Sequence, residues 1–464
     1  MSLLASYFKQ NQFCILVEYL TSQNIVEFKP LLAGYPTVMT LADRVQSDED
    51  LSPIKATQNY PHSIDKVLHF SGKDRDIQDF LQFLSEAQKR NIINLLLLTG
   101  DKLKSHHFGD KDLTQRTRYL ESVNAVMAAK EYGGFHIGVA FNPFKYADAE
   151  KEAQYLKLHK KIKAGADFII MQLGYDIQML KDAQQFFEVH EYNNKLVACV
   201  MPLNLARANY MLKNKVAGVV ITPHMLNVLA YEKEAGIKNQ AYLRCALQIL
   251  IYKNMGYAGI HLSGCHSLDE QIILENYIQE NQHLSLKELE DYWYSLWQVK
   301  SGETFIPVLS NSTFQLNSHQ IQKYKQMDFI HTVFFNSKMS KGIGNFIFKS
   351  SFWDKNAVNR VLLKTEFMSK HRVIGCESCG QCRLEDTLYI CPETCPKGLA
   401  NGPCGGTTLD LCEFGDRECI HSVKVRLAKE VKQTQVLKEK LIATVPVEIR
   451  GTSSWRNWYL TGKN

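Results

Sequence analysis

The sequence contains little that would direct it to a membrane or out of the cell. No apolar run approaches the roughly 20 residues that a membrane-spanning helix requires, and "LLLL" within "NIINLLLLTG" is far too short. The start, "MSLLASYFKQNQ", lacks the basic region and following apolar run of a secretory signal. We therefore expect a soluble, cytoplasmic protein with no membrane partner.

The chain also has no large excess of positive over negative charge. The net charge is +6, the basic residues are spread along the chain, and charged residues make up only 22% of it. This pattern argues against a nucleic-acid partner and weakly favours an anionic small ligand. A hydrophobic content of 45% is ordinary for a globular protein, and 464 residues leave room for a large domain and a smaller one.

Short β-rich runs recur along the first part of the chain, separated by helical stretches. Most are continuously apolar, as expected of parallel strands that are buried on both faces. The runs are 13–19, 35–41, 66–70, 92–98, 135–141, 167–173, 195–201 and 257–263. Eight β-then-α units over roughly 290 residues predict an α/β fold, the (β/α)8 TIM barrel.

Two features bear on an alternative fold. The segment "AGVVITP" (217–223) could be a ninth strand, which leaves a doubly wound open sheet as the second choice. No Gly-x-Gly-x-x-Gly motif follows the first run, and this absence argues against a dinucleotide-binding Rossmann fold. We expect the barrel over 1–300, a connecting segment without assigned function over 301–370, and a smaller cysteine-rich metal-binding domain over 371–464. The charged run 422–443 is predicted to be helical.

Polar side chains lie near the C-terminal ends of the predicted strands, where barrel enzymes place their catalytic residues. Glu18, Thr40, His69 and Gln172 end such runs, and Asp101 follows "LLLLTG". Because Glu18 interrupts an apolar run, we expect it to be partly buried with a raised pKa, as suits a general acid. Structural roles stay open: an ion-paired Glu18, a helix-capping Asp101, a satisfied core His69 and a loop-bonding Gln172.

Taken together, these residues resemble the methylenetetrahydrofolate reductase family of flavin-dependent barrel enzymes. "LVEYL" is similar to its Phe-Glu-Phe motif, "LLLLTGD" to its Leu-Arg-Gly-Asp, and "LHKKIKAGADFIIMQL" to its Lys-Arg-Lys-Val-Asp-Ala-Gly-Ala stretch. The resemblance implies Glu18 as the catalytic acid, Asp101 as a catalytic and substrate-binding carboxylate beside the flavin, and Gln172 as the pterin-binding amide. The implied flavin contacts are Thr40, His69, Thr99, Gly100, Asp101, Phe141, Lys157, Lys160 and Lys161.

The same resemblance implies an activity in one-carbon metabolism. The reaction would be flavin-dependent reduction of 5,10-methylenetetrahydrofolate to 5-methyltetrahydrofolate, with FAD or FMN as cofactor. Electrons would come from NAD(P)H, or from a carrier protein through a C-terminal metal cluster, and a homo-oligomer is compatible with this reading.

Some positions depart from the family: Thr99 stands where Arg is frequent and Lys157 where Asn is frequent. Two alternatives stay open, a folate-dependent one-carbon transferase with structural zinc and a folate- or flavin-binding accessory subunit.

Cysteine is sparse until residue 376 and then abundant. In a reducing compartment, clustered cysteines favour metal ligands over disulfides. The Cys-x-x-Cys-x-x-Cys spacing suits an iron–sulfur cluster, with zinc as the alternative, and eight thiolates could complete two four-ligand sites. "CPKGLANGPCGG" resembles a C-terminal domain that accompanies some members of the family; it would relay electrons to the flavin or clamp the module to the barrel. The predicted ligands are Cys376, Cys379, Cys382, Cys391, Cys395, Cys404, Cys412 and Cys419.

Overall fold

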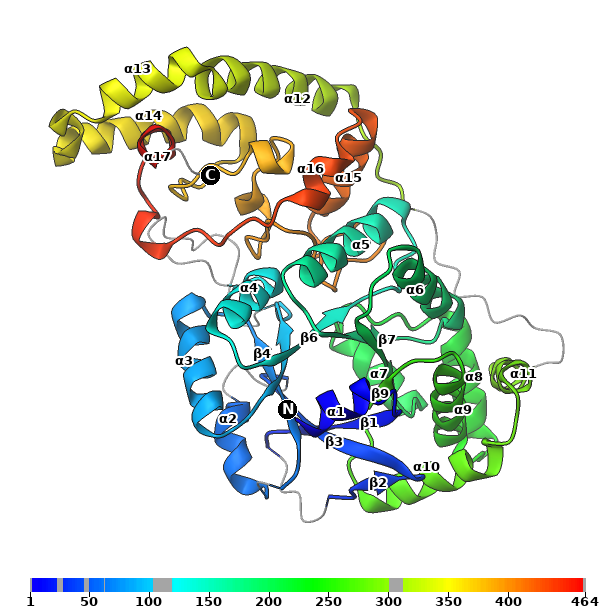
Figure 1. The fold of residues 1–464 in the computed structure, drawn as a ribbon. Helices are drawn as coiled ribbons and strands as arrows, with labels where there is room; N and C mark the ends of the chain where they lie inside the picture. The colour runs from blue at the N-terminus through cyan, green and yellow to red at the C-terminus, as the bar shows by residue number, and fades with distance from the viewer. Residues whose placement is uncertain are drawn as a thin grey trace.

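The chain folds into a barrel and a smaller C-terminal module that packs on one side of it (Figure 1). The computed structural model describes residues 2–22, 28–45, 50–61, 63–102, 119–299 and 312–461. The start of the predicted connecting segment, up to residue 311, lies outside these described residues.

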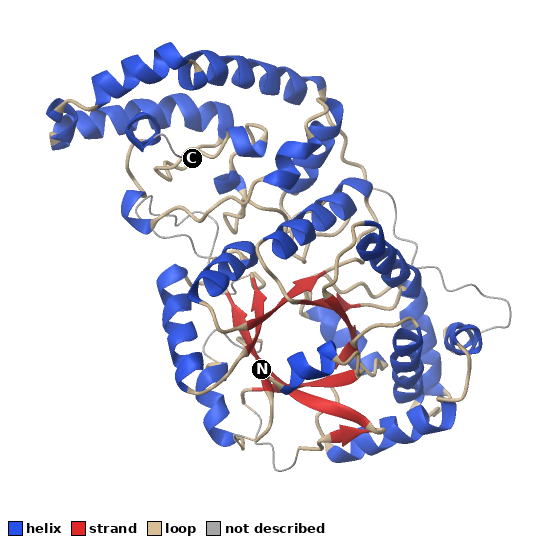
Figure 2. Ribbon diagram, in the orientation of Figure 1, coloured by secondary structure: helices blue, strands red, loops and turns tan. Residues whose placement is uncertain are grey.

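Parallel strands form a closed barrel at the centre of the larger part (Figure 2). The eight barrel strands are β1 (Cys14–Leu20), β3 (Tyr35–Ala42), β4 (Lys66–Ser71), β5 (Asn94–Leu98), β6 (His136–Phe141), β7 (Phe168–Leu173), β8 (Lys195–Val200) and β9 (Gly259–Leu262). β1 pairs with both β3 and β9, which closes the sheet. Each predicted run is therefore a strand, and the predicted (β/α)8 fold is confirmed.

Helices surround the barrel. They are α2 (Pro53–Ala56), α3 (Ile77–Lys89), α4 (Ser122–Tyr132), α5 (Asp148–Lys163), α6 (Ile177–Val189), α7 (Leu205–Lys213), α8 (Pro223–Glu234), α9 (Gln240–Asn254), α10 (Leu268–Asn281) and α11 (Leu286–Ser295). The suspected strand over 217–223 is wrong. Pro223 opens α8 and the Thr222 side chain accepts from the Met225 backbone N–H, so this stretch leads into a capped helix. The extra strand, β2 (Leu31–Leu32), is instead an antiparallel partner of β3.

The interior of the barrel is apolar toward the N-terminal ends of the strands. Leu16, Val38, Val67, Ile170 and Val197 belong to one buried cluster there, which the N-terminal helix α1 (Leu3–Lys9) closes. Side chains alternate across a strand, so the residue two positions later on each strand also points inward, at the C-terminal mouth. The inward-facing residues at the mouth are Glu18, Thr40, His69, Gln172 and Cys199. The change from apolar to polar along the barrel axis positions the candidate site.

The C-terminal module is made of helices joined by cysteine-rich loops. The helices are α12 (Ser318–His331), α13 (Lys338–Phe348), α14 (Asn356–Ile374), α15 (Ile420–Glu430), α16 (Thr434–Glu439) and α17 (Ser454–Thr461). The run predicted as helical over 422–443 is thus two helices, and both pack with α5 of the barrel (Figure 1). None of the helices in the described part of the chain is long and apolar enough to cross a membrane.

Candidate functional site

Glu18 lies at the mouth of the barrel among histidines from other strands. The carboxylate interacts with His261, His69 and His266 and with the Ser263 hydroxyl. The rings of His69 and His261 lie 5.8 Å apart. Parallel pairing brings these groups together, because β1 lies between β3 and β9 and its Glu18 is in register with Thr40. Partial burial of Glu18, expected from sequence, is confirmed.

The His261 ring is held on both sides. Its Nε2 lies 3.0 Å from Thr40 Oγ1, and its Nδ1 lies 3.6 Å from Cys199 Sγ. Cys199 and His261 are register neighbours on β8 and β9. The sequence reading missed His261 and Ser263. The signal that could have found them is their alternation with apolar residues in "GIHLSG", at the C-terminal end of the last strand.

The pKa of the Glu18 carboxyl is lowered. Burial is the largest single effect and would raise it, but His261, His69 and the Ser263 hydroxyl together outweigh burial. The sequence-based expectation of a raised pKa is therefore wrong. Its physical reason is that the stabilising neighbours come from β4 and β9, which the apolar run around Glu18 does not reveal.

The pKa values of both core histidines are lowered. Burial lowers the pKa of His69 to about 3, with His261 adding to the shift, and burial also lowers the pKa of His261. His69 Nε2 is buried and makes no hydrogen bond with the described residues. A buried polar nitrogen without a partner is costly. The mouth of the barrel therefore has an atom that a bound polar molecule would satisfy.

Asp101 and Gln172 lie at the same end of the barrel as Glu18, since all follow or end parallel strands. Gln172 Nε2 donates to the Ala217 carbonyl at 3.2 Å, and its Oε1 accepts from the Leu173 backbone N–H. Burial raises the pKa of the Asp101 carboxyl; the Lys397 ammonium opposes this shift and the Glu413 carboxylate adds to it. Both of these charges belong to the C-terminal module, so the module contributes to the electrostatics of the mouth.

Three further predicted cofactor contacts are placed near β5 and β6. Thr99 Oγ1 donates to Ser122 Oγ at 3.3 Å, and Gly100 has a φ of +88°. The Gly100 carbonyl accepts from Lys397 Nζ at 2.8 Å. Phe141 is buried and packs edge-on against Tyr155, with ring centroids 5.0 Å apart. The Gly100 carbonyl is thus already engaged by the C-terminal module.

The lysines predicted to bind the flavin phosphate lie on α5, the barrel helix that contacts the module. Lys157 Nζ pairs with Glu121 at 3.0 Å and donates to the Gly402 carbonyl at 3.1 Å. Lys161 Nζ donates to the Ala140 carbonyl, and burial lowers its pKa to about 7. Lys160 is almost fully buried, and burial lowers its pKa to about 8. Two of the three ammonium groups are therefore committed to protein acceptors.

The loop "ANGPCGG" of the module forms most of this contact. The Glu121 carboxylate accepts from the backbone N–H groups of Ala400 and Asn401, both at 3.1 Å. Gln154 donates to the Cys404 carbonyl. A Cβ at Gly402 would lie 2.6 Å from the Lys157 side chain. This glycine thus permits close approach of the loop to the barrel, and sequence reasoning missed that role because Glu121 carries no motif of its own.

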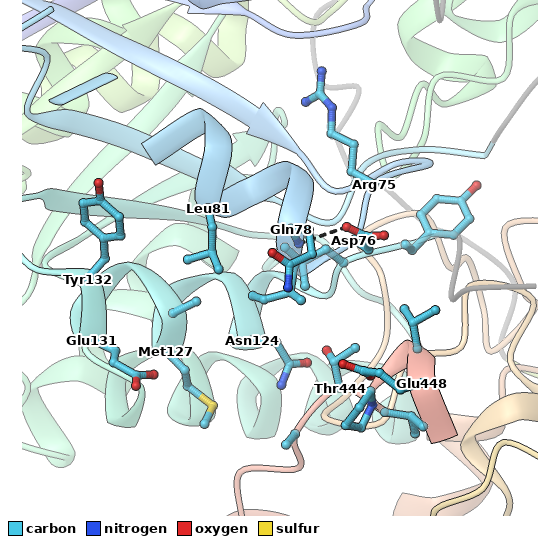
Figure 3. Close-up of a pocket in the computed structure, with 18 residues that line it drawn as sticks. Arg75, Asp76, Gln78, Leu81, Asn124, Met127, Glu131, Tyr132, Thr444 and Glu448 are labelled. Atoms are coloured by element: carbon cyan, nitrogen blue, oxygen red, sulfur yellow. Dashed lines mark hydrogen bonds between the residues drawn. The ribbon is translucent and has the colours of Figure 1, made fainter. Parts of the chain in front are cut away.

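A groove of about 530 Å³ lies on the flank of the barrel, beside the same interface (Figure 3). Leu81 of α3 and Met127 of α4 face the C-terminal segment that carries Thr444 and Glu448. Asn124 Nδ2 donates to the Ile442 carbonyl at 2.9 Å and fixes one end of that segment. The groove lies between α3, α4 and residues 443–448, so it belongs to the contact between barrel and module.

The eight predicted metal ligands fall into two groups in space. Cys376, Cys379, Cys382 and Cys391 line one small cavity of about 20 Å³. The other four interact electrostatically with one another; they are Cys395, Cys404, Cys412 and Cys419. None of the eight forms a disulfide. Within the described ranges, no three His, Cys, Asp or Glu side chains are arranged to hold a metal ion, so the ligand set stays a prediction.

A buried lysine tests whether a metal–thiolate centre fits this region. Lys424 of α15 is 2% exposed, its Nζ makes no hydrogen bond with the described residues, and it interacts electrostatically with Cys395 and Cys391. A buried ammonium is costly unless a negative charge offsets it. Protonated thiols carry no such charge, whereas metal-bound thiolates do. The donor chemistry and the cation beside it therefore fit a metal–thiolate centre.

A closed (β/α)8 barrel with a carboxylate and two buried histidines at its C-terminal mouth is the architecture of a barrel enzyme. Residues 33–271 match the family described as methylenetetrahydrofolate reductase, and residues 355–447 match the family described as methylene-tetrahydrofolate reductase C terminal. The first match covers more than half of the chain. The chain belongs to the methylenetetrahydrofolate reductase family.

Individual relatives are more distant. Methylenetetrahydrofolate reductase 1 of Schizosaccharomyces pombe is 26% identical over 177 residues, which are 37% of this chain and 28% of that protein. Methylenetetrahydrofolate reductase 2 of the same yeast is 30% identical over 156 residues, 31% of this chain and 24% of that protein. The matched part thus spans about a quarter of the length of these curated relatives.

One solved structure overlaps with the barrel only loosely. An uncharacterized protein from Clostridium thermocellum, which binds two copies of 5-methyl-5,6,7,8-tetrahydrofolic acid, covers 61% of this chain and 99% of its own with a TM-score of 0.42 and 12% identity. At that level the overlap adds nothing to the family assignment.

Proposed function

We propose that the chain reduces 5,10-methylenetetrahydrofolate to 5-methyltetrahydrofolate at the mouth of the barrel. The observation that carries this proposal is the Glu18 carboxyl set among His69, His261 and Ser263 at the strand ends. Membership of the family supports the same activity. Asp101 and Gln172, at the same end of the barrel, supply the remaining polar groups that the reaction needs.

The reaction opens the five-membered ring of the folate. The departing amine nitrogen must gain a proton, a cation forms at the methylene carbon, and a hydride then reaches that carbon. A flavin held at the mouth would supply this hydride. Glu18 delivers the proton, and the Asp101 carboxylate stabilises the cation through its negative charge. The Gln172 amide can donate and accept along the pterin edge.

The lowered pKa of Glu18 sets a condition on this role. An ionised carboxylate must take up a proton before it can act as an acid. Binding of the pterin would exclude water from the mouth, which disfavours the charged carboxylate and raises its pKa. His261, held by Thr40 and Cys199, keeps the carboxyl in position while it changes protonation state.

The residues fit the two ends of a flavin unequally. Thr40 and His69 at the mouth suit the ring end, where His69 Nε2 needs a partner. Lys157 and Lys161 do not suit the phosphate end, because Glu121, Gly402 and Ala140 already engage them. We therefore assign only the ring end of FAD or FMN to residues of this chain. NAD(P)H or a carrier protein would reduce it.

We further propose that the two cysteine groups hold metal–thiolate centres, either iron–sulfur clusters or zinc. Burial lowers the pKa of Lys424 to about 8 while Cys395 and Cys391 oppose that shift, so thiolates at these positions would keep its ammonium charged. The contacts of Lys397 with Gly100 and of Cys404 with Gln154 place the second group next to the barrel, so its centre would clamp the module there. An electron relay to the flavin is the added role if the metal is iron–sulfur.

Replacing Glu18 by Gln tests the proposed reaction. The amide keeps the shape but cannot donate a proton of suitable acidity, so folate turnover should fall by about 10²–10⁴-fold. Reduction of an artificial dye by the flavin should stay near the wild-type rate, which shows that cofactor binding survives. Full folate turnover in the variant would remove Glu18 from the acid role.

An anaerobic preparation distinguishes this proposal from its alternatives. Flavin absorbance together with folate turnover supports the reductase. A colourless protein that contains only zinc favours a folate-dependent one-carbon transferase. Bound flavin or folate without turnover favours an accessory subunit. Iron, sulfide and zinc quantification on the same sample identifies the metal.

A further inference from the structure

The outer helix of the C-terminal module, α13, carries apolar side chains on two opposite faces. It runs along the edge of the module that points away from the barrel (Figure 1). Its inner face packs on α17: Phe348 stacks with Tyr459 at a centroid distance of 5.6 Å, and a Cβ at Gly344 would lie 2.3 Å from the Tyr459 ring. This face accounts for one apolar side of the helix.

The opposite face is open to solvent. Met339 is 76% exposed, Ile343 53%, Phe346 84% and Ile347 44%. These four positions follow the spacing of one helical face, and we call them the α13 stripe. Large apolar side chains gathered on one exposed face mark an interaction surface.

The charges around the α13 stripe are all of one sign. From Phe329 to Trp353 the sequence contains three lysines, Lys338, Lys341 and Lys349, and no Asp or Glu. Helical spacing places Lys338 and Lys349 on the same side of the stripe, next to its border, whereas Lys341 lies on the inner side of the helix, where it acts on His331. The acids that bound this segment are engaged elsewhere: Asp328 accepts from Tyr389, and Asp354 pairs with Arg456. The surface is therefore apolar and cationic at once.

We propose that the α13 stripe docks on the surface of an anionic lipid bilayer. Helices of this kind lie in the membrane interface, with apolar and aromatic side chains among the acyl chains and lysines reaching the headgroups. The length of α13, 11 residues, suits an interfacial helix and not a spanning one. Composition alone predicts no membrane partner, because the stripe contributes only a few residues to the whole chain.

The charge pattern favours lipid over a second copy of the chain. A symmetric pair would set each stripe against its own copy, so the lysines of one would face those of the other. Anionic headgroups supply the opposite charge. Because α13 lies away from the barrel, docking there leaves the mouth and the interface around α5 unchanged.

Co-sedimentation with vesicles tests the proposal. The full chain should bind vesicles of equimolar phosphatidylcholine and phosphatidylglycerol roughly thirtyfold more tightly than vesicles of phosphatidylcholine alone, since Lys338 and Lys349 each add attraction near the surface. Phe346→Asp should abolish binding. Val189→Asp, at a 71% exposed position on barrel helix α6, is the matched control and should bind like wild type.

A lysine variant and a mass measurement complete the test. Lys338→Glu with Lys349→Glu should weaken binding to anionic vesicles more than binding to phosphatidylcholine vesicles. No binding to anionic vesicles, or equal binding by Phe346→Asp, overturns the proposal. Self-association that Phe346→Asp abolishes, without vesicle binding, also overturns it and assigns the α13 stripe to a second copy. Analytical ultracentrifugation of the same variants gives that readout.

Discussion

The barrel and the C-terminal module are stabilised in different ways. In the barrel, buried apolar side chains form one cluster that extends from β1 to Trp297, with a second cluster inside the strands. In the module the corresponding clusters are small: one is shared with α5 of the barrel, and the other includes Cys376 and Cys391. Like the barrel, the module also buries charged groups, among them Glu366, Arg383 and Lys397.

This difference indicates which interactions stabilise each part. A barrel with an extensive apolar core supports itself. A small module with little apolar core needs other sources, such as metal ligation, buried polar networks or a neighbouring domain. Here Glu366 accepts from Ser453 and Ser454, Arg383 pairs with Glu393, and the loop around Gly402 packs on Lys157. We therefore expect metal and interface changes to affect the module, and core changes to affect the barrel.

Removing thiol ligands should have the largest effect on the module. Cys391→Ser combined with Cys395→Ser takes one ligand from each proposed centre. Structural metal contributes on the order of 10 kcal/mol to folding, so the module should lose its fold while the barrel keeps its own. Metal content and limited proteolysis across residues 312–461 measure this loss. Cys245→Ala, in barrel helix α9, is the control. Unchanged metal content and protease resistance would contradict the proposed ligands.

Truncating a core side chain should have the largest effect on the barrel. Phe168 is fully buried and packs on Phe8, with ring centroids 5.6 Å apart. Phe168→Ala removes that packing and leaves a cavity, so the free energy of unfolding should fall by about 4 kcal/mol. Urea unfolding measures it. Phe329→Ala, at a 68% exposed position in the module, should change little. Similar losses from both variants would weaken the contrast between the two parts.

Breaking the buried ion pair at the interface should release the module from the barrel. Glu121→Gln removes the charge that pairs with Lys157. An unpaired buried ammonium is unfavourable by on the order of 3 kcal/mol, and backbone N–H groups of the module lose a charged acceptor. Faster proteolysis between barrel and module would report the effect. Glu131→Gln, an exposed position on the same helix, is the control, and equal proteolysis rates in both variants would argue against an electrostatic contact.

Lowering the pH should destabilise the barrel through His69. Its pKa is about 3 in the folded chain and about 6.5 when unfolded, so between these values only the unfolded chain binds the proton. The free energy of unfolding should therefore fall by about 1.4 kcal/mol for each pH unit below 6.5 from this group. Urea unfolding of wild type and His69→Gln at pH 7 and pH 5 isolates the contribution. An identical pH dependence in both proteins would show that His69 titrates alike in the two states.

Local patterns in the sequence were sufficient to predict the barrel and some of the residues at its mouth. Continuous apolar runs such as 167–173 predict buried parallel strands because every backbone group in them is paired and both faces are covered. Residues that end such runs, including Glu18 and Gln172, share one end of the barrel because parallel strands all point the same way. The cysteine spacing likewise indicated the chemistry of the tail, although not which four cysteines lie together.

Only the tertiary structure determined how the residues of the site affect one another and where the module contacts the barrel. The direction of the Glu18 pKa shift depends on His69 and His261, which are about 50 and 240 residues away along the chain. The contacts of Lys157 depend on a loop about 245 residues further on. Electrostatic and hydrogen-bonding effects act through space, so a sequence shows which groups are available, and only the folded chain shows which of them meet.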